Sequence, residues 1–457
     1  DLFNYGCRYE EYLLTGDKDV LDELIALMHG QFNNYDELGL DYWRCGQDEV
    51  AAAIWQLAVD NGATTAMTYY YMGLAGKKEG FDLGAQACSD YCFPNRLEAI
   101  LALQAAIDYN AGDAKAHYYL GTLYYGARQY DVARLHWNRS AELDPTFPTV
   151  WRNLALEEFN KENNPEQAVA DMEKAFSLNT RDSRILMELD QLYKRLGYDH
   201  DMRLKHLEQY PELIAQRDDL LLEEITLLNL TGHYEQAKEK LDAHQFHPWE
   251  GGEGKVSGQY QLSRVELARQ ALDRKDFDAA IQLLNECLVY PSHLGEGKLY
   301  GAQENDFYYF LGCAYDAKGE NEKAKECWEK ATLGPTEPVA AMYYNDAKPD
   351  KIFYQGMALL KLGRTDEAHG RFYKLVNYGK NHLFDNVVMD YFAVSLPDLQ
   401  IWEGNLNLAN RVHCNYMLAL GYYGLGDKEH GQRYLEEAAK LDPNHLGIYQ
   451  FNTVCDM

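Results

Sequence analysis

A chain of 457 residues is too long for a single compact core, and its 46% hydrophobic and 13% aromatic content excludes a disordered protein. The formal net charge of -29 repels phosphate backbones and anionic lipids, so neither nucleic acid nor a membrane surface is an expected partner. The sequence has no apolar run of about 18 residues, the length that a membrane-spanning helix needs.

The first residues show no secretory signal pattern, and nine scattered cysteines favour a reducing compartment. We therefore expect a cytoplasmic protein. Because the sequence begins with Asp rather than Met, we also expect it to be a piece of a longer protein.

The N-terminal part of the chain predicts successive pairs of helices. Residues 2–30 form a degenerate pair, a clear unit begins at Phe32, and a third unit begins near Ala66. The third unit is interrupted by an insertion near residues 77–95, and its second helix resumes at Leu97. Long loops of this kind inside compact repeats are uncommon and are often functional.

The clearest unit begins at Ala114 and follows a pattern of about 34 residues. The residues that fix the pattern are Leu120, Gly121, Tyr124, Ala133, Trp137 and Pro145, at positions 7, 8, 11, 20, 24 and 32. Small residues at positions 8 and 20 let the first helix (helix A) and the second helix (helix B) approach closely. The aromatic side chains fill the space beside them, and the proline ends helix B.

The remainder of the chain repeats this unit with varying fidelity. Further units begin at Pro148, Ser183, Asp218, Gln261, Asn305, Pro349 and Val412. A second insertion lies near residues 380–410. We therefore expect an all-α protein, a right-handed α-solenoid of about ten helix-turn-helix repeats, with an N-terminal array at 1–212 and a C-terminal array at 213–457.

This pattern resembles the tetratricopeptide repeat over nearly the whole chain. Segments beginning at Tyr91, Phe147, Phe246 and Phe392 further resemble the C-terminal repeat half of a family of large bacterial proteins. In that family a β-rich domain of unassigned function, similar to sugar-binding sandwiches, precedes the repeats. The resemblance implies a missing domain that handles carbohydrate, and it offers no assigned functional residues.

Helix A positions 2, 5, 9 and 12 line the concave groove of a tetratricopeptide array. The candidate groove residues at these positions are Trp43, Tyr70, Lys115, Tyr118, Tyr125, Arg152, Phe159, Arg184, Tyr309, Phe353, Tyr416 and Tyr423. An aromatic wall with a few cations suits an extended peptide or a glycan, although the same rings could instead pack between successive helices. The Lys, Arg and Asn pattern that clamps a chaperone carboxylate is not present.

The tetrapeptide Gly-Glu-Gly-Lys occurs twice, ending at Lys255 and at Lys298, and each copy precedes a helix A. A phosphate-binding loop would need glycine where Trp249 stands and Ser or Thr where Val256 and Leu299 stand. We therefore interpret both copies as linker or rim loops, with Trp249 as a possible rim contact of the groove.

No catalytic, metal or cofactor constellation is visible. Cys88 and Cys92 have no histidine pair at zinc-ligand spacing nearby. We expect a non-enzymatic scaffold that binds a protein, a peptide or the chain's own missing domain. The alternative is a carbohydrate-binding or carbohydrate-active module, which a closed toroid with two carboxylates about 5–10 Å apart would favour and an open superhelix would exclude.

Overall fold

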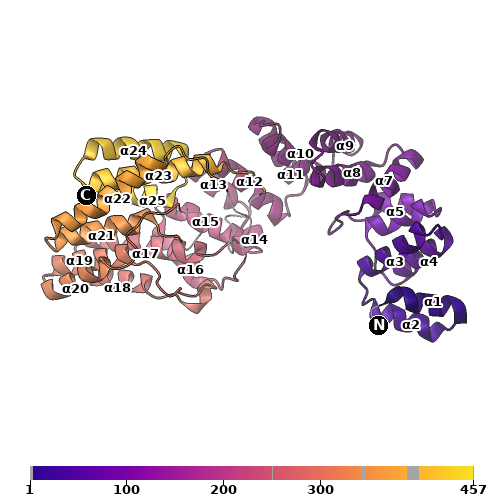
Figure 1. Ribbon diagram of the computed structural model, residues 1–457, viewed down its shortest axis with the longest axis horizontal. Helices are drawn as coiled ribbons and strands as arrows, with labels where there is room; N and C mark the ends of the chain where they lie inside the picture. The colour runs from indigo at the N-terminus through magenta and orange to yellow at the C-terminus, as the bar shows by residue number, and fades with distance from the viewer. Residues whose placement is uncertain (1–3, 250, 341–345, 389–400, 456–457) are drawn as a thin grey trace. The chain divides into compact units, whose positions relative to one another are not determined.

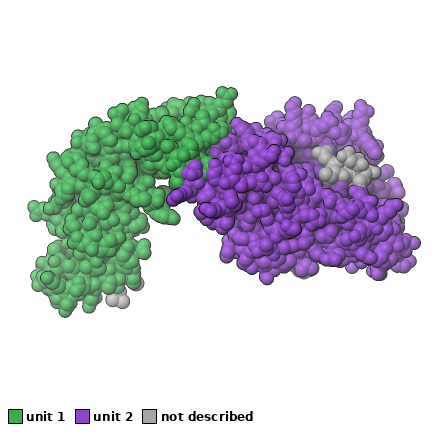
Figure 2. Space-filling model, turned by 180° about the vertical axis from the view of Figure 1, so that it is seen from behind, with its two compact units in different colours: residues 1–179 green, residues 180–457 purple. Residues whose placement is uncertain are grey.

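The computed structural model describes residues 4–249, 251–340, 346–388 and 401–455. Every regular element in these ranges is a helix, as the sequence predicts (Figure 1). The chain divides into two compact units, Asp1–Asn179 (unit 1) and Thr180–Met457 (unit 2) (Figure 2).

Unit 1 is a series of helical hairpins. Its helices are α1 (Tyr5–Thr15), α2 (Lys18–Leu27), α3 (Phe32–Arg44), α4 (Asp48–Asp60), α5 (Ala66–Leu74), α6 (Glu79–Gln86), α7 (Leu97–Tyr109), α8 (Ala114–Gly126), α9 (Tyr130–Leu143), α10 (Pro148–Asn160) and α11 (Pro165–Leu178). The predicted insertion near residues 77–95 is not simply a loop, because it contains α6, which packs against α5.

Unit 2 begins with α12 (Ser183–Arg195). The remaining elements are α13 (His200–Leu207), α14 (Pro211–Ile214), α15 (Asp218–Leu230), α16 (Tyr234–Ala243), α17 (Lys255–Asp273), α18 (Phe277–Cys287), η1 (Ser292–Leu294), α19 (Asn305–Lys318), α20 (Asn321–Ala331), α21 (Pro349–Lys361), α22 (Thr365–His382), α23 (Leu406–Gly424), α24 (Lys428–Leu441) and α25 (Leu446–Cys455). Much of the second predicted insertion, near residues 380–410, lies outside the described residues.

The helices of a hairpin meet where an aromatic ring of helix B covers a glycine of helix A. The four pairs, each separated by sixteen residues, are Gly39 with Trp55, Gly121 with Trp137, Gly312 with Trp328, and Gly356 with Phe372. A Cβ atom on Gly121 would lie 2.4 Å from the Trp137 ring. Trp137 is buried and donates its indole N–H to the Tyr118 carbonyl at 3.1 Å, so the ring has no room to move away. The glycine therefore sets the distance between the two helices.

Replacing Gly121 with alanine should destabilise unit 1 by about 1–3 kcal/mol, because the new methyl group overlaps the buried Trp137 ring. Gly126 is the matched control, since it ends the same helix and its Cβ would have no neighbour within 4 Å. Urea unfolding of the two alanine variants measures the difference. Equal unfolding midpoints for Gly121→Ala and Gly126→Ala would contradict this account of helix spacing.

Asp36 is a buried carboxyl group in α3. Its Oδ2 atom accepts a hydrogen bond from the Thr68 hydroxyl at 3.2 Å, which links α3 to α5. Burial raises the pKa of Asp36 to about 7. The folded chain therefore keeps a proton that the unfolded chain releases at lower pH.

The Asp36→Asn variant tests this pKa. Between about pH 4 and pH 7 the folded parent binds more protons at this site than the unfolded parent, so its stability falls as the pH rises. An asparagine side chain does not titrate, so the variant does not lose stability in this way. Its free energy of unfolding relative to the parent should therefore rise across this window, by at most about 4 kcal/mol. Chemical denaturation at a series of pH values measures it, and parallel stability profiles for the two proteins would refute the shifted pKa.

Two loops near the C-terminal end of unit 2 contact its first two helices, α12 and α13. The Asn444 side chain donates to the Lys194 carbonyl at 3.1 Å and accepts from the Arg203 guanidinium at 3.1 Å. The Trp402 indole donates to the Glu188 carbonyl at 2.9 Å. The two ends of unit 2 therefore meet, so its repeats complete a closed turn.

Candidate functional site: a helix-filled groove and a glycine-loop pocket

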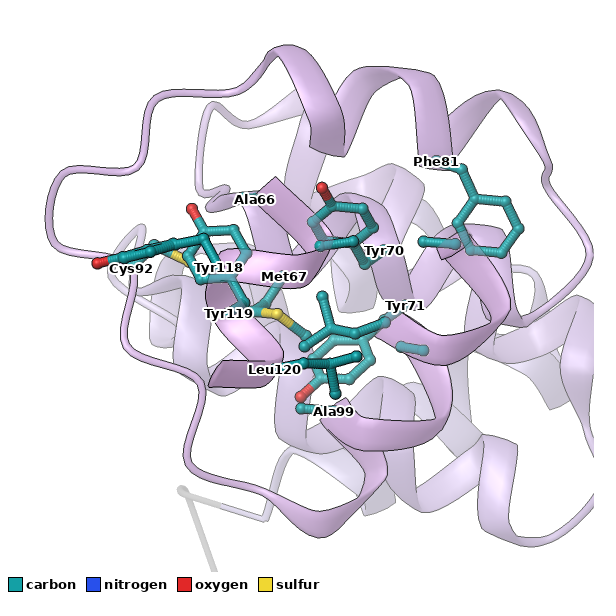
Figure 3. Packing of buried hydrophobic residues seen from close by; sticks show 14 of the residues in the cluster. Ala66, Met67, Tyr70, Tyr71, Phe81, Cys92, Ala99, Tyr118, Tyr119 and Leu120 are labelled. Carbon is teal, nitrogen blue, oxygen red and sulfur yellow. The ribbon is translucent and has the colours of Figure 1, made fainter. Parts of the chain in front are cut away.

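Two of the predicted groove residues of unit 1 belong to its core (Figure 3). Tyr70 is 0% exposed and donates its hydroxyl to Asp113, the N-cap of α8, at 3.0 Å. Tyr118 is 8% exposed and meets the Phe147 ring edge-on, with ring centroids 4.9 Å apart. Both side chains are therefore covered by the next repeat, and neither lies on an accessible groove surface.

The other candidates of unit 1 are partly buried. They are Trp43, Lys115, Tyr125, Arg152 and Phe159. The Lys115 amine donates to the Ala87 carbonyl, and the Tyr125 ring packs against Trp137 with centroids 5.2 Å apart. These contacts use the side chains to hold neighbouring segments of unit 1 together.

The candidates of unit 2 give a different result, because three of them surround one helix, α25. Phe451 of α25 packs edge-on against Phe353 of α21 and Tyr423 of α23, with ring centroids 5.3 and 5.1 Å apart. The Tyr416 hydroxyl, also from α23, donates to the Gly447 carbonyl at 3.1 Å. Three of the predicted groove residues, from α21 and α23, therefore pack against the chain's own C-terminal helix.

Polar contacts anchor the opposite side of α25. The Tyr449 hydroxyl lies 2.6 Å from the Tyr234 hydroxyl of α16. Arg269 of α17 donates to the Gln450 carbonyl at 3.3 Å and also pairs with Glu266 at 3.0 Å. Helix α25 is thus held by aromatic rings on one side and by hydrogen bonds on the other.

The two remaining candidates of unit 2 do not contact α25 in this way. Tyr309 of α19 is partly buried against Tyr354, with ring centroids 5.4 Å apart. Arg184 of α12 is exposed and pairs with Glu188 at 2.9 Å. Phe451, which sequence reasoning missed, follows the last recognised repeat, and its spacing of three residues from Ile448 is the signal for a further amphipathic turn.

Carboxylates do gather beside α25, but the space between them is small. The cavity that Glu266, Asp306 and Asp350 border with Arg269 has a volume of about 20 Å³, enough for about one water molecule. Asp306 is moreover paired with the Lys351 amine at 2.5 Å. No sugar ring fits here, so this part of the closed turn does not form a glycosidase cleft.

A much larger pocket lies where the two Gly-Glu-Gly-Lys loops meet. Its volume is about 720 Å³. Its lining residues lie within the segments 247–249, 252–261 and 290–303. Asp346, Lys348 and Lys351 complete the lining. Trp249, predicted as a rim contact of the groove, borders this pocket, and the indole rests against Gly252, where a Cβ atom would lie 2.3 Å from the ring.

Glu296 joins the two loops. Its carboxylate accepts the backbone N–H groups of Val256 at 3.2 Å and Ser257 at 3.1 Å, in the first turn of α17. These are the N–H groups that a phosphate would use at a helix N-terminus. The chain's own carboxylate therefore occupies the anion position, which explains physically why the loops are not a phosphate cradle.

Removal of this carboxylate should loosen α17. Glu296→Ala leaves two backbone donors without their acceptor, so we expect a loss of about 1 kcal/mol of stability and faster hydrogen exchange at Val256 and Ser257. The control is Glu253→Ala, which removes the exposed glutamate at the same place in the first Gly-Glu-Gly-Lys copy. If the amide hydrogens of Val256 and Ser257 exchange at the parental rate in both variants, Glu296 does not cap α17.

Comparison with known proteins identifies the repeats. Family profiles described as tetratricopeptide repeat match residues 114–147, 306–333 and 412–445. In the residues that the structure describes, no group of three or more His, Cys, Asp or Glu side chains could hold a metal ion. No helix in those same ranges is long and apolar enough to cross a membrane.

Several solved structures are similar to parts of the chain. YrrB, described as a TPR protein with an unusual peptide-binding site, is 17% identical over 50% of this chain and 90% of its own, with a TM-score of 0.29. The structure of Naa15/Naa10 bound to HypK-THB is 14% identical over 92% of this chain and 66% of its own, with a TM-score of 0.34. A tetratricopeptide repeat protein from Parabacteroides merdae is 15% identical over 61% of this chain and 92% of its own, with a TM-score of 0.32. Together with the fold, the profile matches show that both units contain tetratricopeptide repeats.

Proposed function

We propose that this chain is a non-enzymatic scaffold that binds a helical segment of a protein partner in the groove of unit 2, in exchange with α25. The observation that carries the proposal is the position of α25, whose Phe451 lies between aromatic residues of α21 and α23. A helix that lays its apolar side into a groove is a common mode of protein recognition. We propose that this segment belongs to another protein.

The energetics of α25 suit exchange. The helix has ten residues, too few to be stable in water without the groove. Ile448 and Phe451 are each 3% exposed, and burying two such side chains contributes about 3–6 kcal/mol in total. Because α25 is tethered directly after α24, it competes at an effective concentration in the millimolar range. A partner helix therefore needs to bury more apolar side chains than α25 does. Otherwise it binds only under a condition that releases α25.

Shortening the chain should expose the groove. A protein that ends at residue 445 should bind a labelled peptide of residues 446–455, whereas the intact chain should not, because its own α25 covers the same surface. The Phe451→Ala peptide should bind at least about tenfold more weakly, since it lacks the ring that contacts Phe353 and Tyr423. Fluorescence anisotropy measures both affinities, with a shuffled peptide of the same composition as the control.

A second variant covers the case in which the shortened chain does not fold. Phe451→Asp in the full-length chain places a charge among aromatic rings and should release α25 while the repeats remain helical. It should then bind the parental peptide. If neither protein binds that peptide while both keep their helix content by circular dichroism, the proposed exchange is wrong.

A further inference from the structure

We infer that the pocket between the two Gly-Glu-Gly-Lys loops binds an uncharged oligosaccharide. This inference is independent of the helix groove, because it concerns the loops that precede α17 and α19. At about 720 Å³ the pocket has the size of an ordinary small-molecule site. It is formed by loops about forty residues apart in sequence that Glu296 holds together.

The charges around the pocket disfavour an anion. Glu253, Glu296 and Asp346 border it together with Lys348 and Lys351, so acidic side chains outnumber basic ones. Lys351 is already paired with Asp306, and Glu296 already fills the N-terminus of α17. A nucleotide or phosphate would thus meet little net attraction.

The aromatic residues of the pocket offer flat surfaces to a ligand. The Trp249 indole lies against Gly252 and is partly exposed. Tyr300 borders the pocket and is fully exposed, so its ring is not used for packing within unit 2. Aromatic rings of this kind pack against the apolar faces of sugar rings and keep their polar edges in water.

Polar groups beside these rings suit hydroxyl ligands. The Gln261 amide donates to the Tyr290 hydroxyl at 3.0 Å, so the Tyr290 oxygen acts as an acceptor and its own proton can be donated onward. Gly258 and Gly297 have no atom within 4 Å of a Cβ position, so a ligand can approach the backbone there. Neutral donors and acceptors next to aromatic rings are what a polyhydroxylated, uncharged ligand requires.

The test uses the intact chain and a pocket-filling variant. Gly258→Leu places a side chain into the open space without backbone strain, and leucine favours the helix over glycine. Gly370→Leu is the matched control, because Gly370 is also a helical glycine with no neighbour within 4 Å but lies outside the pocket. A second pair, Tyr300→Ala with the exposed Tyr91→Ala as control, removes only a surface ring.

Isothermal titration calorimetry should be run with neutral oligomers of glucose, xylose, mannose, galactose and N-acetylglucosamine. Parallel titrations use ATP, inorganic phosphate, an oligogalacturonate and the peptide of residues 446–455. We expect at least one neutral oligosaccharide to bind at millimolar concentration or below, Gly258→Leu to weaken it by at least about tenfold, and both controls to leave it unchanged. The inference is overturned if no neutral oligosaccharide binds, if only an anion or the peptide binds, or if Gly258→Leu binds like the parent.

Discussion

The contact between a glycine of helix A and an aromatic ring of helix B is the constraint on which the rest of the structure depends. At Gly121 and Gly312 a Cβ atom would lie within 2.4 Å of the indole ring on the partner helix. The absence of a side chain lets the two backbones approach, and the ring then fixes their separation. The contact recurs at Gly39, Gly121, Gly312 and Gly356 of the described chain.

In unit 2 the same geometry continues until its ends meet. Asn444 and Trp402 connect the last repeats to α12 and its neighbours, and α25 follows immediately after this junction. Helix α25 packs against α21, α23, α16 and α17. Terminal repeats of solenoids commonly need such a cover for their apolar faces. A covering helix that relies on a groove for its own stability is also a natural competitor for anything else that binds there.

Local spacing was sufficient to predict the repeats, because the glycine and aromatic positions recur at fixed intervals. It also led to Phe353, Tyr416 and Tyr423 as candidate groove residues, and all three contact α25. It could not predict that Tyr70 is buried, since that depends on a hydrogen bond to Asp113, 43 residues away. The position of α25 depends on closure of the turn, which involves residues more than 200 positions apart.

The sequence shows both glycine loops but not the contact that joins them. Each copy of Gly-Glu-Gly-Lys is non-periodic, and taken alone it reads as a linker. Their common role appears only when Glu296 of the second copy reaches the helix that follows the first. Tertiary contacts of this kind leave no periodic pattern in the chain.

The most direct test of the central claim, that inward aromatic residues of unit 2 form a groove covered by α25, is oxidative side-chain labelling. The intact chain and the chain ending at residue 445 would be labelled in parallel, and modification read out by mass spectrometry. The account predicts strong new labelling of Phe353, Tyr416 and Tyr423, while buried Trp55 of unit 1 stays protected in both proteins. Unchanged labelling of the three groove residues in a shortened chain of parental helix content would contradict it.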